Sequence, residues 1–177
     1  MTSFNQLTTT KKGTLGEYIV DRYLLGKNII PYSPKADIAH PFDRLCASTN
    51  KKNIFIAEVK TKASRSYYPD TGINLKSYEE YKFIENKYGI DVWMFFVDEY
   101  KKKIYGNKLS NLDKPIEIIH KNKILNYPLI ESHNFGKKII YFPLEYMVDV
   151  CDIDDKVSEE LKELSTRSYE YERNNNG

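Results

Sequence analysis

Apolar residues recur at helical spacing near the start of the chain. Leu15, Ile19 and Tyr23 follow one another at intervals of four residues, which predicts one buried face of a helix. Thr14 has the side chain of a helix N-cap and Gly26 that of a helix end. We therefore expect a helix that begins at Thr14 and ends near Gly26.

Two short segments that follow have the composition of β-strands. Residues 43–48 and 53–60 are rich in apolar and β-branched side chains, and the polar residues 49–52 between them are turn-like, so a β-hairpin is predicted. Glu58 and Lys60 share one face of the second strand, because side chains alternate with a period of two. The carboxylate and the ammonium should point the same way.

A helix and a buried strand are predicted next. Residues 61–73 are polar and are expected to form a loop, after which Asn74 or Ser77 can cap a helix that runs to about Lys87. The uninterrupted apolar run over residues 91–98 predicts a central strand buried on both faces. Such a strand implies that helices cover the sheet.

The pattern is weaker in the rest of the chain. Three short β segments are expected, the first of them at a sheet edge: 103–106, 116–119 and 139–142. We expect one domain over residues 1–151, with its core at about 13–98, a loose polar leader over 1–12 and a loop-rich β extension over 99–151. Residues 152–177 are expected to form a charged tail, partly helical or disordered.

Composition excludes several classes of protein. The chain has 177 residues, 41% hydrophobic and 29% charged, which suits one soluble α/β domain. Cys46 and Cys151 are the only cysteines, so neither a disulfide framework nor a zinc site is predicted and a cytoplasmic location is expected. No stretch approaches the roughly 20 apolar residues of a membrane-spanning helix, so no membrane partner is expected.

The distribution of charge favours a polyanionic partner. The net charge is +2, but residues 152–177 carry eight acidic and four basic side chains, which leaves +6 on residues 1–151. An excess of Lys and Arg favours nucleic acid through counterion release. Charge of this size is also common on proteins that never bind nucleic acid.

The residues with the clearest chemistry are two acids and a lysine. Asp43 precedes Glu58 by fifteen positions, and Lys60 follows Glu58 by two. Carboxylates at adjacent strand ends are the oxygen ligands that Mg²⁺ prefers, and such a metal can acidify a bound water and neutralise a phosphodiester. The lysine can stabilise the charge that develops during attack. Glu17 adds a third carboxylate, although its place near a helix start equally suits a capping role.

This arrangement resembles the PD-(D/E)XK, or restriction-endonuclease-like, nuclease superfamily. The similar features are a helix with Glu17, a strand after Pro41-Phe42-Asp43, a strand with Glu58-Val59-Lys60, a second helix and a buried strand. The resemblance implies an α/β fold with an α-β-β-α-β core, its mixed central sheet flanked by helices. Within the superfamily, Glu58-Val59-Lys60-Thr61 is similar to the corresponding strand of junction resolvases and of phage or homing nucleases.

The resemblance also implies an activity. Asp43 and Glu58, joined by Glu17, would be ligands of Mg²⁺ or Mn²⁺, and Lys60 would be catalytic in an endonuclease that hydrolyses DNA. One departure is that Phe42 separates Pro41 from Asp43, so the literal Pro-Asp pair is absent.

Some assignments near this site have alternatives. Asp37 competes with Asp43 as the first acidic ligand, but it precedes Pro41 and is expected in a connecting loop. His40 lies beside the site and is more often a loop residue than a catalyst at such a position.

Several residues could contact DNA, namely Lys62, Arg65, Lys76, Lys82, Tyr67 and Tyr68. The cations could bind phosphates and the tyrosines could stack on a base; a solvated basic surface and tyrosines packed over a core edge are the competing interpretations. A homodimer is a further hypothesis, because two-fold dimers suit cleavage of both duplex strands. Two alternatives to an enzyme stay open: a non-catalytic nucleic-acid-binding or inhibitory module of the same fold, and a structural protein.

Overall fold

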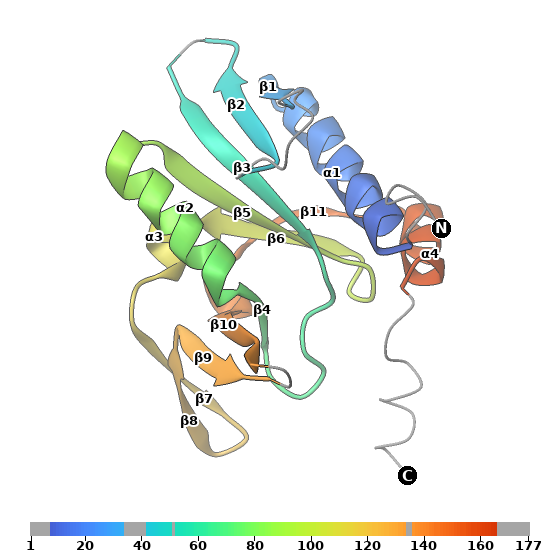
Figure 1. The fold of residues 1–177 in the computed structure, drawn as a ribbon. Helices are drawn as coiled ribbons and strands as arrows, with labels where there is room; N and C mark the ends of the chain where they lie inside the picture. Colours follow the sequence, from blue (N-terminus) through green and yellow to red (C-terminus); the bar gives the residue numbers. More distant parts are fainter. Residues whose placement is uncertain (1–7, 34–41, 51, 134–135, 166–177) are drawn as a thin grey trace.

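The central feature of the computed structural model is a six-stranded sheet with the order β1-β2-β3-β5-β6-β11, between helix α1 on one face and helix α2 on the other (Figure 1). The structure describes residues 8–33, 42–50, 52–133 and 136–165. The strands are Ile29–Tyr32 (β1), Arg44–Ser48 (β2), Ile54–Thr61 (β3), Asp91–Asp98 (β5), Lys103–Lys108 (β6) and Val148–Asp152 (β11). Only β3 and β5 pair in parallel. The predicted α/β class, with a mixed sheet flanked by helices, is confirmed.

Two smaller sheets complete the fold. One has the order β4-β10-β9 and the other is the hairpin β7-β8. Their strands are Asp70–Asn74 (β4), Ile116–His120 (β7), Lys123–Tyr127 (β8), Leu129–Ser132 (β9) and Lys138–Pro143 (β10). The described helices are Thr8–Gly26 (α1), Leu75–Tyr88 (α2), Leu109–Leu112 (α3), the 3-10 turn Leu144–Tyr146 (η3) and Asp155–Glu163 (α4). None of these helices is long and apolar enough to cross a membrane.

Strand β5 divides the hydrophobic core into two layers. Its even-numbered residues, among them Met94 and Phe96, pack with Tyr81 and Ile84 of α2. Its odd-numbered residues, among them Phe95, pack with α1 on the other face. Burying both faces of one strand explains its uninterrupted apolar sequence and places β3, the adjacent strand, between the two helices.

Helix α1 begins earlier than predicted, at Thr8 rather than Thr14. The hydroxyl of Thr14 donates a hydrogen bond to the carbonyl of Thr10 at 3.1 Å, so Thr14 lies inside the helix and is not its N-cap. The ammonium of Lys12 lies 2.6 Å from the buried carboxylate of Glu99. This contact, distant in sequence, stabilises a first turn that local propensity does not predict.

Helix α2 follows the prediction more closely. Its N-cap is Asn74, whose side chain accepts a hydrogen bond from the backbone of Lys76, and Gly89 ends it in a left-handed conformation. Ser77, the alternative cap, lies within the helix. Because α2 follows directly on β4, its N-terminus lies next to the sheet β4-β10-β9 (Figure 1).

Two strand predictions are corrected, and β1 is a strand that the sequence analysis did not predict. Pro31 lies in β1, an edge strand where the missing N–H of proline is tolerated. The predicted loop over residues 61–73 contains most of β4. The segment 103–106, predicted at an edge, lies inside the sheet as β6, because β11 pairs with it on its outer side.

Candidate active site

Asp43 and Glu58 lie against one another at the junction of β2 and β3. The backbone N–H of Asp43 donates a hydrogen bond to Oε2 of Glu58 at 3.2 Å, and the backbone N–H of Val59 donates to Oδ2 of Asp43 at 2.8 Å. Antiparallel pairing of β2 and β3 produces this arrangement, because Arg44 lies opposite Ala57 in the register. The two predicted ligands are therefore close, each fixed by the backbone of the other's strand.

Glu58 is almost completely buried, with 3% of its surface exposed. Its Oε1 accepts a hydrogen bond from the ammonium of Lys60 at 2.5 Å and another from the hydroxyl of Tyr81 on α2. The side chain of Lys60 keeps 33% of its surface exposed. The ammonium thus contacts the buried acid and still has access to solvent, as a group that acts on a substrate requires.

Part of the hydrogen-bonding capacity of both carboxylates is left over. An ionised carboxylate has about four lone-pair sites on its two oxygens. Oε1 of Glu58 uses its two for Lys60 and Tyr81, whereas Oε2 accepts one hydrogen bond from the described residues, that of the Asp43 N–H. Within the described part of the chain, Oδ1 of Asp43 accepts no hydrogen bond and Oδ2 accepts one. Each acid therefore retains acceptor sites for a further ligand.

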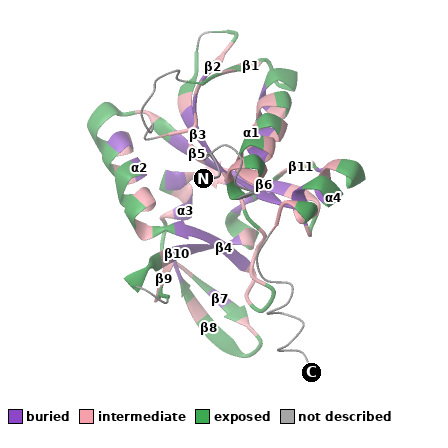
Figure 2. Ribbon diagram, turned by 45° about the vertical axis from the view of Figure 1, so that its right-hand side comes forward, coloured by how far each residue is buried: buried purple, intermediate pink, exposed green. Residues whose placement is uncertain are grey.

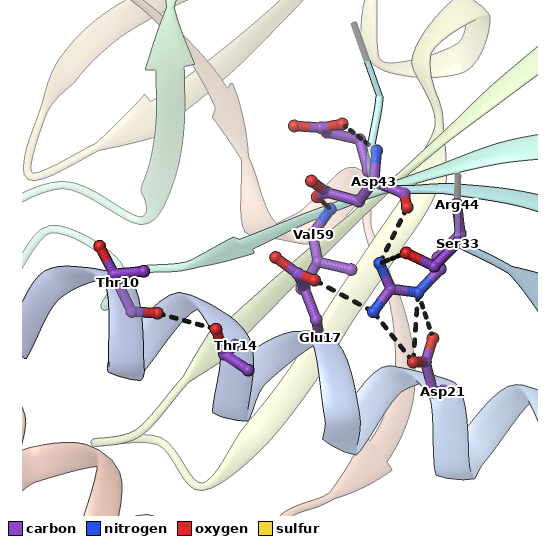
Figure 3. A network of polar contacts seen from close by, with 9 residues as sticks. Thr10, Thr14, Glu17, Asp21, Ser33, Asp43, Arg44 and Val59 are labelled. Atoms are coloured by element: carbon purple, nitrogen blue, oxygen red, sulfur yellow. Dashed lines mark hydrogen bonds and ion pairs between the residues drawn. The ribbon is translucent and has the colours of Figure 1, made fainter. Parts of the chain in front are cut away.

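Glu17 belongs to a second cluster beside the first, centred on Arg44 (Figure 3). The guanidinium of Arg44 lies 3.0 Å from Glu17 and 2.9 Å from Asp21, both on α1. It also donates a hydrogen bond to the carbonyl of Asp43 at 2.8 Å. Arg44 thus joins α1 to Asp43, the first predicted metal ligand, and holds the backbone of Asp43 in place.

The site holds more negative than positive charge. Burial raises the pKa of Glu58, and the charge of Asp43 raises it further, while Lys60 opposes the shift. The pKa of Glu17 is also raised, first by burial and then by the charge of Asp43. A divalent cation between these acids would relieve the part of both pKa shifts that the charge of Asp43 causes.

The donors suit Mg²⁺ or Mn²⁺ bound by few protein groups. Among the residues that the structure describes, no three His, Cys, Asp or Glu side chains are gathered as a metal site, since Glu17 is turned to Arg44. Asp43 and Glu58 remain as a pair of carboxylates. Mg²⁺ commonly binds one or two carboxylates and keeps waters or phosphate oxygens in its other positions, so the pair fits such an ion.

The predicted DNA contacts after β3 have different surroundings. The ammonium of Lys62 lies 3.3 Å from the carbonyl of Gly72. The guanidinium of Arg65 is bound to Asp70 and Glu131 and lies between the rings of Tyr68 and Tyr141. Lys62 and Lys60 line the same pocket, whereas the charge of Arg65 is already compensated.

The remaining predicted contacts are Tyr67 on the loop after β3 and two lysines on α2. Tyr67 is exposed, and the ammonium of Lys121 lies 4.0 Å from the centre of its ring. Lys76 extends into solvent, with Glu80 at 3.9 Å. Lys82 lies 3.1 Å from Glu85. Binding of DNA by any of these residues stays a prediction.

Sequence reasoning missed three residues of the site: Asp21, Arg44 and Tyr81. A signal for the first two exists, because Glu17 and Asp21 lie one turn apart on a helix and a nearby cation would offset the repulsion between two such acids. Tyr81 has no such signal, because its hydroxyl contact with Glu58 depends on the tertiary fold.

Three candidates, Asp37, His40 and Pro41, fall outside the described residues. The competition between Asp37 and Asp43 is therefore judged from Asp43 alone, whose contacts with Glu58 are those given above.

Comparison with known proteins gives structural likenesses only. No family model matches the chain, and a search of curated proteins finds no match either. Among solved structures, the Holliday junction resolvase Hjc of Archaeoglobus fulgidus is similar with a TM-score of 0.49 and 10% identity, over 82% of this chain and 99% of that one. D212, a nuclease from a fusselovirus, is similar with a TM-score of 0.45 and 11% identity, over 86% of this chain and 93% of that one.

The first is described as a resolvase and the second as a nuclease. Because both TM-scores lie below 0.5 and both identities are near one residue in ten, the function proposed below rests on the geometry of the site.

Proposed function

We propose that the protein is a metal-dependent endonuclease that hydrolyses phosphodiester bonds in DNA with Mg²⁺ or Mn²⁺ as cofactor. The observation that carries the proposal is the contact between Asp43 and Glu58, with Lys60 on the same buried acid. Two carboxylates with acceptor sites left over and an accessible ammonium match what metal-assisted phosphodiester hydrolysis needs.

Asp43 and Glu58 would hold the cation. Bound there, it would neutralise charge on the phosphodiester and acidify a water. Tyr81 would keep Glu58 in position by donating its hydroxyl to Oε1. Arg44 would position Asp43 through its carbonyl. Each acid is thus oriented by the fold before any substrate binds.

Lys60 would act on the substrate itself. Its ammonium can leave Glu58 and donate to a phosphate oxygen as negative charge develops there, because a third of the side chain is exposed. An ammonium on a flexible stem suits this exchange of partners better than a guanidinium held by two parallel hydrogen bonds. We propose a cytoplasmic location from the two unpaired cysteines. A homodimer stays a hypothesis that sedimentation measurements can test.

The test is a cleavage assay on plasmid, linear duplex and single-stranded DNA, with Mg²⁺, with Mn²⁺ and in EDTA. We expect cleavage only with a divalent cation. Glu58→Ala and Lys60→Ala should each lower the rate by at least about 10²-fold, as expected when a charge-stabilising group is lost. Glu80→Ala and Lys102→Ala, which remove exposed charges away from the site, are the matched controls. Undiminished cleavage by both site variants would refute the proposal.

A second candidate is a non-catalytic DNA-binding module of the same fold. It is favoured by one observation, that Glu17 is paired with Arg44, which leaves two acids for a cation among the residues that the structure describes. Binding of DNA at the same affinity with and without metal, and no cut in any of the substrates, would favour this alternative.

A further inference from the structure

The hairpin β7-β8 has two apolar side chains on its solvent-facing side, where polar side chains are expected. One face of the hairpin is a small core, in which Ile118 and Tyr127 pack against Tyr141. On the opposite, solvent-facing side, Ile119 and Ile124 lie directly across from one another in the register. They are 77% and 63% exposed, so this pair covers nothing in the described chain.

The tip of the hairpin is a tight turn that carries two lysines. Lys121 and Asn122 form a two-residue turn in which both have positive φ, 47° and 63°, the conformation of a type I′ hairpin. No ion pair is found for Lys121 or Lys123 among the described residues. Glu117, two positions before Ile119, is the acid on the same face. Two isoleucines are therefore followed by two uncompensated ammonium groups at the end of the hairpin.

The hairpin contacts the loop that follows β3, the strand that carries Glu58 and Lys60. The ring of His120 lies 2.9 Å from the carbonyl of Tyr67, and the ammonium of Lys121 lies over the Tyr67 ring. A cavity of about 370 Å³ lies at this junction, lined in part by Tyr67, Tyr68, Lys101, His120 and Lys121. The hairpin extends from the end of the molecule opposite β1 and β2, with exposed surface along it (Figure 2).

The loop that the hairpin contacts begins at the end of β3, the strand that carries Glu58 and Lys60. Tyr67 lies seven positions after Lys60, and an extended chain of that length spans at most about 25 Å. One turn of B-DNA is about 34 Å long. The residue that the hairpin contacts is therefore separated from Lys60 by less than the length of one turn of duplex.

We propose that the hairpin β7-β8 is a DNA-contacting arm, in which Lys121 and Lys123 bind phosphates and the Ile119–Ile124 pair inserts as a wedge at a base step. Apolar side chains flanked by cations are used in this way by proteins that kink DNA. Inserting a wedge requires unstacking, which is least costly where stacking is already interrupted. The arm therefore selects DNA with a weakened base step as the substrate class. The inference rests on the proposed function, since it takes DNA as the ligand.

The test measures binding alone, in EDTA, so that its result does not depend on cleavage. Fluorescence anisotropy would compare the full chain on a fully paired duplex and on the same duplex with one central mismatch. We expect the mismatched duplex to bind about tenfold more tightly, in line with an unstacking cost of one to a few kcal/mol. Ile119→Ser with Ile124→Ser should bring this ratio close to one, while Ile130→Ser, an exposed isoleucine of β9, should leave it unchanged.

Lysine substitutions at the tip test the second half of the proposal. Lys121→Ala with Lys123→Ala should weaken binding of both duplexes equally and reduce the slope of log affinity against log salt by about two. Thermal unfolding of every variant checks that it folds. An unchanged ratio in the isoleucine variant would overturn the proposal, as would its loss of self-association with no effect on DNA binding.

The experiments can refute the proposed nuclease function and the proposed DNA-contacting arm independently of one another. Mismatch preference without metal-dependent cleavage would retain the arm and refute the nuclease. Metal-dependent cleavage with no effect of the hairpin variants on binding would retain the nuclease and refute the arm.

Discussion

Two buried carboxylates, Glu58 on β3 and Asp70 on β4, are each contacted by a cationic side chain and a tyrosine hydroxyl. Glu58 contacts the cation of Lys60 and the hydroxyl of Tyr81. Asp70 contacts the cation of Arg65 and accepts a hydrogen bond from the hydroxyl of Tyr127 at 2.6 Å. Both cations come from residues close in sequence.

The two clusters differ in how completely the acid is compensated. Asp70 is 0% exposed and receives two parallel hydrogen bonds from the guanidinium, both at 2.5 Å, which is the geometry that holds a carboxylate most firmly. Glu58 has a single ammonium and a second acid, Asp43, against it. A saturated pair stabilises the fold, whereas an undersaturated one can accept a cation.

The contrast predicts that removing the two acids has effects of very different size on the free energy of unfolding. Asp70→Ala should lower the free energy of unfolding by about 3 kcal/mol, because the guanidinium of Arg65 loses its main partner inside the protein. Glu58→Ala, measured without metal, should change it far less, since a desolvated acid beside another acid is removed. Urea denaturation followed by circular dichroism measures both.

Glu131→Gln is the matched control for Asp70→Ala, since Glu131 contacts the same guanidinium at 2.8 Å but is partly exposed. Glu131→Gln should lower the free energy of unfolding by less than about 1 kcal/mol. An equal decrease in the free energy of unfolding for Asp70→Ala and Glu58→Ala would contradict the assignment of Asp70 to a structural cluster and Glu58 to a functional one.

A smaller effect is expected from Asp43→Asn, which keeps an oxygen for the N–H of Val59 and removes one negative charge. Without metal at neutral pH, the variant should be as stable as the wild type or more stable, by on the order of 1 kcal/mol. The reason is that the charge of Asp43 raises the pKa of both Glu58 and Glu17.

The same shifts fix the sign of the pH dependence. A folded-state pKa above the ordinary carboxyl value of 4.5 means that the native state binds the proton more tightly than the unfolded chain. The contribution of Glu58 to stability is then greatest at acid pH and declines as pH rises from 4.5 through the raised pKa. This decline should be weaker in Asp43→Asn. A decline of the same size in both proteins would contradict the charge coupling.

Local patterns predict the fold where the chain has one dominant period. The apolar run of β5, the hairpin β2-β3 and the cap of α2 at Asn74 are confirmed. The start of α1 is not predictable in this way, because the contact of Lys12 with Glu99 spans 87 positions. Strand β4 was missed for a similar reason: its polar sequence is stabilised by pairing with β10, far along the chain.

In the candidate site, too, some features follow from local sequence patterns and others depend on contacts between distant residues. The fifteen-residue spacing of Asp43 and Glu58, together with the order of elements, predicts the pair that the structure brings together. The partners that tune it, Arg44 and Tyr81, come from a strand and a helix whose packing the sequence does not specify. Arg65 was predicted to bind phosphate, but whether a neighbouring acid occupies its charge depends on tertiary contacts with Asp70.

Binding of a cation by Asp43 and Glu58 is tested most directly with a crystal of the protein soaked with Mn²⁺ and examined by anomalous scattering. We expect one strong peak between the carboxylates of Asp43 and Glu58, absent from crystals of Asp43→Asn. No peak at that position, in crystals of protein that cleaves DNA with Mn²⁺, would show that these two acids do not hold the catalytic metal.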